Sequence, residues 1–253
     1  SAPPMVPFLQ PHIKVVSLDV NTIMHEAIFG DEDTNSHIWE YDDAGSIQAK
    51  TDATDFEDGG FTIVTGGSSA DQTAVGTAIT PFRCDTGLPW WITTRVAFDD
   101  FDLVEFFFGI SEQKINVDSF HVSAAANSKD RVGFVKDVHN DNSIHFAASK
   151  NAGGTIATDL DTAQTYDANN SVLTMGIHWD GAGNIKFYLN KVATGTEPGV
   201  MTLVHTYTTT AGIPDDSNNR LTLFIENGSA AARTATVEYL QGAYTTTVTP
   251  NGL

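Results

Sequence analysis

The sequence predicts an all-β protein, built as a two-sheet antiparallel jelly-roll sandwich with an extended N-terminal arm. Helical periodicity is almost absent, and residues that favour strands and turns, such as Thr, Val, Phe, Gly, Asn and Asp, are frequent. At least ten short segments with the character of strands lie between residues 58 and 245, separated by turn residues at the spacing typical of jelly rolls. A length of 253 residues suits one large domain, which we place at residues 46–253.

Residues 1–45 are expected to form the arm, which would dock on a neighbouring subunit or on another protein. The first eleven residues contain four prolines, which favour an extended chain. Docking would bury apolar side chains, at ~25 cal/mol per Å² of apolar surface removed from water. These interface candidates are Phe8, Leu9, Ile13, Val15, Val16 and Leu18. The stretch VVSLDVNTIMHEAIFG fits either a strand or a short helix.

Within the domain, the first strands are predicted at GFTIVTG and TAITPFRCD. A hairpin of WWITTRVAF and VEFFFGISE follows, and then a hairpin of RVGFVKD and SIHFAASKNAG. The third hairpin joins VLTMGIHWD to IKFYLN through the turn GAGN, where Gly181 and Gly183 supply the positive φ angles that a tight turn needs. LTLFIEN and ARTATVEYLQGAY form the last hairpin around an NGS turn signal.

The stretch DFDLVE, residues 100–105, places three acids in an apolar context. It resembles the Glu-x-Asp-x-x-Glu motif of the family-16 glycoside hydrolases, in which the first Glu is the nucleophile and the last is the acid/base. That resemblance implies roles for Asp100, Asp102 and Glu105. Asp100 is one methylene shorter than the family's Glu, which moves its carboxyl by about 1.5 Å, and a misplacement of ~1 Å can cost a factor of about 100.

Clustered aspartates are also typical of turns. We therefore interpret DFDLVE as a hairpin tip, with Asp102 and Glu105 in solvent and Phe106–Phe108 returning to the core. No catalytic residue is predicted, and the hydrolase interpretation is the alternative for this stretch.

Aromatic residues are candidates for a sugar-binding platform. Trp90 and Trp91 are adjacent, and adjacent strand residues face opposite ways, so we expect one in the core and the other outward. An exposed Trp can stack on a glycan or fill a subunit interface. Trp179 and Tyr188 are further candidates, and His178, which alternates with Ile177 and Trp179, is expected on the sheet surface. The alternative is that both Trp90 and Trp91 pack within the fold.

Charge and composition exclude several partners. Thirteen basic and thirty-two acidic residues give a net charge of −19, which argues against nucleic-acid binding. No segment approaches the ~18 apolar residues of a membrane helix. The single cysteine, Cys84, permits neither an intrachain disulfide nor a thiolate metal site. No cofactor is predicted, since phosphate-binding and dinucleotide motifs are absent, and calcium in the acidic loops remains unassigned.

The order of segments from residue 56 onward resembles the concanavalin A-like and laminin G-like jelly rolls of tailed-phage virion proteins. The segments that carry the resemblance are PWWITTRVAFDD, VEFFFGIS, RVGFVKD, GIHWDGAGNIKFYLNKV, LTLFIENGS and ARTATVEYL. The resemblance implies a non-enzymatic structural virion protein, a capsid decoration (cement) protein on the outer surface of a phage head. Its implied partners are the major capsid protein and copies of itself, commonly in a homotrimer. The alternatives are a carbohydrate-binding, lectin-like adhesion module and a degenerate family-16-like hydrolase.

Overall fold

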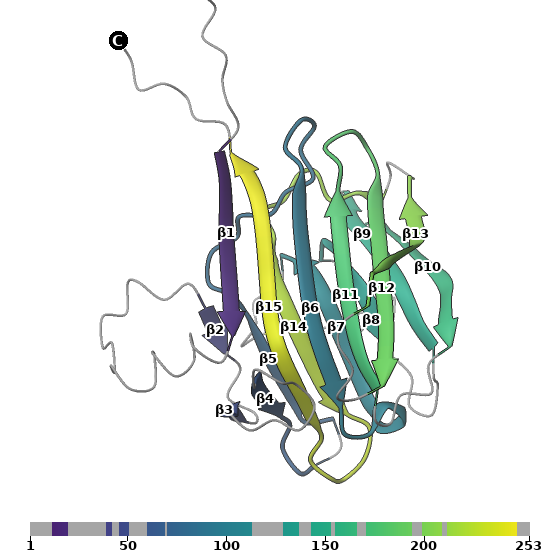
Figure 1. The fold of residues 1–253 in the computed structure, drawn as a ribbon. Coiled ribbons are helices and arrows are strands. Elements are labelled where there is room, and N and C mark those ends of the chain that lie inside the picture. Colours follow the sequence, from purple (N-terminus) through teal and green to yellow (C-terminus); the bar gives the residue numbers. More distant parts are fainter. Residues whose placement is uncertain are drawn as a thin grey trace, which may run out of the picture.

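Two antiparallel β-sheets pack face to face in the structure, a computed structural model (Figure 1). It describes residues 12–19, 39–41, 46–50, 60–68, 70–112, 129–136, 143–152, 155–165, 171–193, 199–208 and 212–246. Nearly all the regular structure in these ranges is strand, which confirms the predicted all-β sandwich.

The eight-stranded sheet has the order β13-β12-β11-β6-β15-β4-β3, and β1 also pairs with β15. Its strands are β1 (His12–Asp19), β3 (Ser46–Lys50), β4 (Gly60–Val64), β6 (Trp90–Phe98), β11 (Ser171–Trp179), β12 (Ile185–Ala193), β13 (Thr202–Tyr207) and β15 (Thr234–Thr246). The seven-stranded sheet has the order β10-β9-β8-β7-β14-β5-β2. Its strands are β2 (Trp39–Tyr41), β5 (Gln72–Thr77), β7 (Val104–Ser111), β8 (Arg131–Lys136), β9 (Ser143–Ala152), β10 (Thr155–Thr165) and β14 (Arg220–Asn227).

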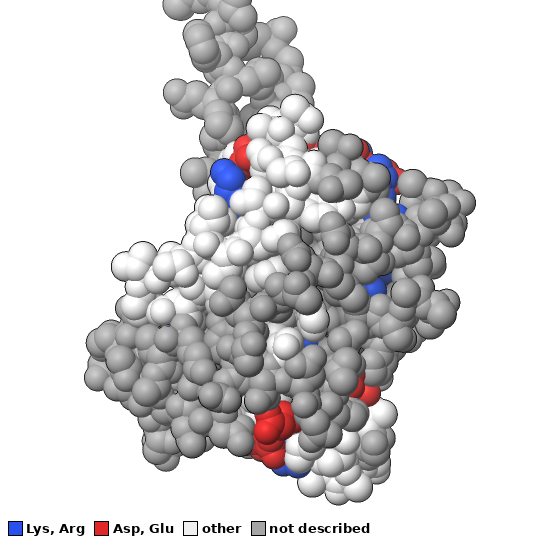
Figure 2. Space-filling view, turned by 90° about the vertical axis from the view of Figure 1, so that its right-hand side faces the viewer, with Lys and Arg blue, Asp and Glu red and all other residues white. Residues whose placement is uncertain are grey.

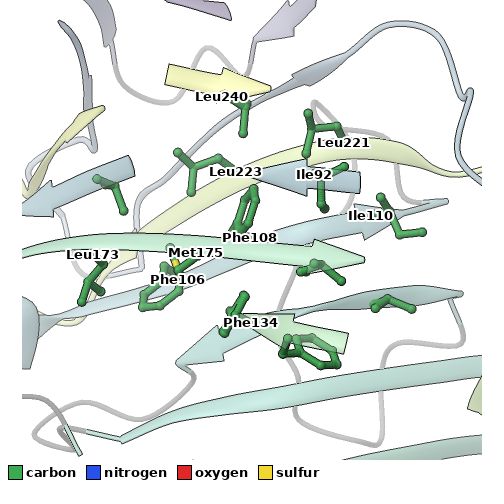
Figure 3. Close-up of a cluster of buried hydrophobic side chains, with 14 of the residues drawn as sticks. Ile92, Phe106, Phe108, Ile110, Phe134, Leu173, Met175, Leu221, Leu223 and Leu240 are labelled. Atoms are coloured by element: carbon green, nitrogen blue, oxygen red, sulfur yellow. The ribbon is translucent and has the colours of Figure 1, made fainter. Parts of the chain in front are cut away.

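The core lies between the sheets and is built by alternate residues of facing strands. Strand β7 contributes Phe106, Phe108 and Ile110, which are buried against side chains from both sheets (Figure 3). Aromatic rings interlock there, because Phe134 lies 5.3 Å from Phe187 in an edge-on contact. The other core residues that Figure 3 labels are Ile92, Leu173, Met175, Leu221, Leu223 and Leu240.

Two of the four predicted hairpins are confirmed. Strand β8 pairs with β9, and β11 pairs with β12. In the turn of the second hairpin, Gly181 and Gly183 have φ angles of 72° and 109°. The Asp180 carboxylate accepts hydrogen bonds there from the backbone N–H of Ala182 at 2.8 Å and of Asn184 at 3.1 Å.

The other two predicted hairpins are wrong, because their strands belong to different sheets. Strand β6 is in the eight-stranded sheet and β7 in the seven-stranded one, and β14 and β15 are separated in the same way. A one-turn 3₁₀ helix, η1 (Phe101–Leu103), carries the chain from β6 to β7. Phe101 is fully buried there and packs against Phe98 and Phe106. A side chain buried between the sheets requires the chain to cross over, whereas a hairpin tip would leave it in water.

The N-terminal region differs from the expected arm in its described parts. Strand β1 pairs with β15 from His12 opposite Thr246 to Asp19 opposite Tyr239, and β2 pairs with β5. Residues 12–19 and 39–41 therefore belong to the sheets of the same chain. A domain boundary at residue 45 and docking by residues 1–45 stay predictions. The segment TAITPFRCD also differs, since β5 ends at Thr77 and only Phe82 beyond it forms a bridge, to Asn219.

Candidate functional site

The two adjacent tryptophans of β6 lie on opposite faces of the eight-stranded sheet. Trp90 is 3% exposed and packs in the core, edge-on to Phe82. Trp91 is half-buried on the outer face. The alternation of the strand thus leaves Trp91 as the outward candidate of this pair.

Trp91 is the centre of an aromatic trough, which we define as Trp91, His178 and Tyr188 with Gly176 beneath. Ring centroids of His178 and Tyr188 lie 5.8 and 5.3 Å from that of Trp91, and both rings are tilted by more than 50° to it. The register of β6, β11 and β12 explains the grouping, since Trp91 is opposite His178 and Gly176 is opposite Tyr188. The flanking rings therefore form walls beside the indole.

Gly176 gives the indole its position. A Cβ atom at residue 176 would lie 2.9 Å from Cζ2 and 3.0 Å from Cη2 of Trp91, and 3.2 Å from the sulfur of Met201. Real Cβ atoms essentially never approach another heavy atom within 3.0 Å, so a side chain at residue 176 would displace the indole from its present position. The absence of one side chain creates the space for a large aromatic surface.

His178 is neutral at pH 7. Burial lowers the pKa of its imidazole, and the positive charge of Lys186 lowers it further, against a smaller opposing effect of Asp180. A neutral imidazole has one N–H donor and one acceptor nitrogen. The trough wall therefore offers a hydrogen-bonding group without a charge.

Two adjoining cavities extend from the trough at the end of the sandwich where β6 begins and β11 and β15 end, at the top of Figure 1. The apolar cavity, of about 150 Å³, is lined by Pro89, Trp90, Trp91, His178, Ala243, Tyr244 and Thr245. The polar cavity, of about 250 Å³, is lined by Pro81, Arg83, Asp85, Leu88, Trp90, Asn218, Tyr244 and Thr245. The cavities share Trp90, Tyr244 and Thr245 as a common wall.

The loop of residues 85–89, which lines both cavities, is held by hydrogen bonds from three other segments. The Trp179 indole donates to the backbone oxygen of Asp85 at 2.9 Å, and the N–H of Gly87 donates to Gly181 at 2.7 Å. Thr245 donates to the backbone oxygen of Pro89 through both its N–H and its hydroxyl, at 3.2 and 3.0 Å. These bonds hold the backbone of the segment that contributes Asp85 and Leu88 to the polar cavity and Pro89 to the apolar one.

The acids of DFDLVE are not grouped on one strand. Asp100 precedes η1 and lies 3.7 Å from Arg233, Asp102 is within η1, and only Glu105 is on β7. Glu105 is 6% exposed and lies opposite Glu226 on the seven-stranded sheet. The prediction that Glu105 is solvated at a hairpin tip is therefore wrong, because β7 begins at Val104 and carries Glu105 into the sheet.

The structure describes four of the six predicted interface residues. Ile13, Val15, Val16 and Leu18 lie on β1 in hydrogen-bonded register with β15. Phe8 and Leu9 lie outside the described residues. Their role in binding a neighbour stays a prediction.

The described ranges show neither a cluster of metal ligands nor a membrane-spanning helix. Among those residues, no three His, Cys, Asp or Glu side chains gather as metal ligands would. No helix in that part of the chain is long and apolar enough to cross a membrane. Cys84, whose sequence neighbours Arg83 and Asp85 line the polar cavity, is buried, and burial raises the pKa of its thiol, so the sulfur stays protonated.

The side of the sandwich that ends in β13 and β10 carries little charge in its described part. Charged atoms visible there lie mostly toward the two ends of the molecule (Figure 2). Next to the trough, Val200 and Leu203 are 88% and 52% exposed, and Leu203 is opposite Tyr188. The aromatic trough thus continues into an exposed apolar margin.

Sequence reasoning found part of this site. It named Trp91 and Tyr188 as aromatic candidates and placed His178 on the sheet surface, and the structure brings all three together. Trp90 and Trp179 are core residues. Arg83, Asp85 and Asn218 were missed, because only the fold brings the loop after Pro81 beside the loop before β14.

Comparisons with known proteins show the fold. No protein-family model matches the chain, and no curated protein matches it in sequence. One similar solved structure is a protein of unknown function from Shewanella oneidensis MR-1, with a TM-score of 0.59, 14% identity and full coverage of both chains. Peanut lectin with a nine-residue peptide has a TM-score of 0.56 and 12% identity over 93% of this chain and 99% of the lectin.

A third similar structure is the CBM2 module of the evolved Dit of Lactobacillus casei BL23 phage J-1. Its TM-score is 0.51, with 9% identity over 95% of this chain and 99% of the module. These likenesses confirm a lectin-like, concanavalin A-like β-sandwich.

Proposed function

We propose that this chain is a carbohydrate-binding β-sandwich and that sugars bind at the aromatic trough and its cavities. The observation that carries the proposal is the partly exposed Trp91, held between His178 and Tyr188 over Gly176. A sugar ring has an apolar C–H face and a rim of hydroxyl groups. An aromatic surface covers the face, and a few polar groups beside it bind the rim.

The fold supports the same function. A lectin and a phage module that is named as a CBM share this architecture. The sequence resemblance put capsid decoration first and a lectin-like module second, and the trough favours the second. We propose that the chain binds without catalysis, since the only acids that resembled a catalytic motif are divided between a turn and a strand.

Glycan-array binding of the wild type and of Trp91→Ala tests the proposal. Covering about 80 Å² of indole surface is worth about 2 kcal/mol at ~25 cal/mol per Å², so loss of the ring should weaken binding about thirty-fold. Trp91→Phe keeps an aromatic face and should retain part of the affinity. Ile79→Ala, a change at an exposed apolar residue that lines neither cavity, serves as the control. An array on which the wild type binds nothing would refute the function.

The virion role remains a second proposal, resting on the sequence resemblance and on the occurrence of the fold in a phage Dit module. Glycan binding and a place on a particle are compatible, because a virion surface can carry adhesion modules. Mass spectrometry across a density gradient of particles tests it. Banding at a fixed ratio to the major capsid protein supports decoration of the capsid and gives the copy number, including the expected trimer, whereas recovery only in soluble fractions excludes it.

A further inference from the structure

We propose that the polar cavity is a second sugar subsite, which selects an uncharged oligosaccharide by its neighbouring hydroxyl groups. In this arrangement one sugar ring lies on the aromatic trough and the apolar cavity, and the next ring enters the polar cavity. The inference rests on the proposed glycan-binding function and adds the ligand class and a set of specificity residues.

The volumes of the two cavities indicate that a ligand would occupy both of them. Ligand sites usually measure roughly 300–1,000 Å³, whereas the polar cavity measures about 250 Å³ and the apolar one about 150 Å³. Neither reaches the range alone, but together they do. Since Trp90, Tyr244 and Thr245 line both, a ligand of two linked rings would follow one continuous wall.

The polar groups of this cavity suit a pair of hydroxyls. Arg83 Nε lies 2.8 Å from Asp85 Oδ1 and also donates to the backbone oxygen of Asp215 at 2.8 Å. Both contacts use Nε, so the two terminal amino groups of this cavity-lining residue remain available as further donors. Asp85 has a second carboxylate oxygen, an acceptor, so the pair presents a donor and an acceptor side by side. Two hydroxyls on adjacent sugar carbons need that combination.

Asn218 completes the set from a different part of the chain. It is exposed, lines the polar cavity and precedes Asn219, which is fixed by the backbone bridge to Phe82. An amide side chain offers both a donor and an acceptor, and the fixed backbone on one side limits where it can reach.

Charge decides against an acidic sugar. The Arg83 guanidinium is already paired with Asp85, and the acidic residues Asp215 and Asp216 follow closely in the adjoining loop, where both face Lys150. The whole chain has a net charge of −19. A carboxylated, sulfated or phosphorylated sugar would meet this negative field, whereas a neutral sugar would not.

Isothermal titration calorimetry with defined sugars tests the inference. The probes are cellobiose, maltose, lactose and mannobiose, each beside its monosaccharides, together with an uronate-containing disaccharide. We expect the wild type to bind one neutral disaccharide at least tenfold more tightly than either of its monosaccharides, and the uronate more weakly. Asn218→Ala and Asp85→Asn should each weaken the disaccharide about five- to tenfold and leave the weaker monosaccharide binding unchanged. Asp216→Asn, an exposed acid outside the cavity lining, is the matched control.

The outcomes separate the two proposals. If Trp91→Ala weakens binding as expected while Asn218→Ala and Asp85→Asn both retain full disaccharide affinity, the second subsite is refuted and the trough stands. Preference for the uronate also overturns the inference. Asn218 makes no contact on which the fold depends among the described residues, so Asn218→Ala remains informative even if the Asp85 variant fails to fold. A wild type that binds none of these sugars or those on the array overturns both proposals.

Discussion

Replacing Gly176 by alanine should weaken glycan binding without unfolding the protein. The new Cβ would lie 2.9 Å from Cζ2 of Trp91, whereas carbon atoms in contact are ordinarily 3.5–4.0 Å apart, so the outer edge of the indole must rise by about 0.6–1 Å. The walls formed by His178 and Tyr188 stay in place, so a bound sugar cannot follow the tilted ring. A gap of this size forfeits a quarter to a half of the contact energy.

Applied to the ~2 kcal/mol assigned to the Trp91 face, this loss is about 0.5–1 kcal/mol, or about two- to fivefold in Kd. Stability should change little, since alanine in a strand is favoured over glycine by roughly 0.5–1 kcal/mol and offsets part of the crowding. Calorimetry with the best sugar from the array measures the affinity. The Trp91 indole N–H resonance, assigned with Trp91→Phe, should shift and gives a readout that needs no ligand.

Gly67→Ala is the matched control, because a Cβ atom at that position would meet nothing within 4 Å. The reasoning about the trough is refuted if Gly176→Ala binds as tightly as the wild type while its indole resonance has moved. An unmoved resonance would instead show that Gly176 does not position the ring.

Three further predictions concern the frame of the site. Burial opposes ionisation of Asp180, but hydrogen bonds from Asn184 and Ala182 and the charge of Lys186 outweigh it and lower its pKa from 3.8 to about 2. The charged Asp180 carboxylate therefore contributes its full stabilisation above pH 3.8 and loses it as the pH falls through about 2. In thermal melts, Asp180→Asn should have a Tm several degrees below that of the wild type at pH 7. Below pH 2 the two Tm values should be equal. Cys84 should not react with a thiol reagent at pH 8 in the native protein and should react fully in denaturant, because burial raises the pKa of its thiol; rapid native labelling would contradict its placement. Deleting residues 1–19 should expose the β15 edge now paired with β1 and cause concentration-dependent self-association in sedimentation experiments; a deletion variant that stays monomeric and equally stable would count against that pairing.

Local sequence patterns predicted the hairpins that depend on local chemistry. The β11–β12 turn needs Gly181 and Gly183 at positive φ and an acceptor at Asp180, and all three are visible in the sequence. The crossing from β6 to β7 was misread, because a hairpin and a crossing between sheets show the same alternation. What separates them is the burial of Phe101, and burial depends on side chains brought from elsewhere by the fold.

The site shows the same division. Alternation along β6 predicts that Trp90 and Trp91 face opposite ways, but it does not tell which of them is buried. That depends on Phe82 and Tyr244, which pack on the inner side. The register of β11 and β12 then selects Gly176, His178 and Tyr188 as neighbours, and register is a property of the assembled sheet.

The position of the acids relative to the trough bears on the choice between binding and hydrolysis. Strand β6 runs from Trp90 at one end of the sandwich to Phe98 at the other, and Asp100 lies just beyond (Figure 1). At roughly 3.3 Å per residue the strand holds Trp91 and Asp100 more than about 20 Å apart. Glu105 lies near the start of β7, just after η1, and belongs to the opposite sheet from Trp91. A sugar stacked on Trp91 therefore lies beyond the reach of either carboxylate, whereas retaining hydrolysis needs two carboxyls about 5 Å apart across the scissile bond. The two sequence features that each suggested a sugar therefore cannot serve one active site, and we propose that the sugar binds at Trp91, which has a cavity beside it.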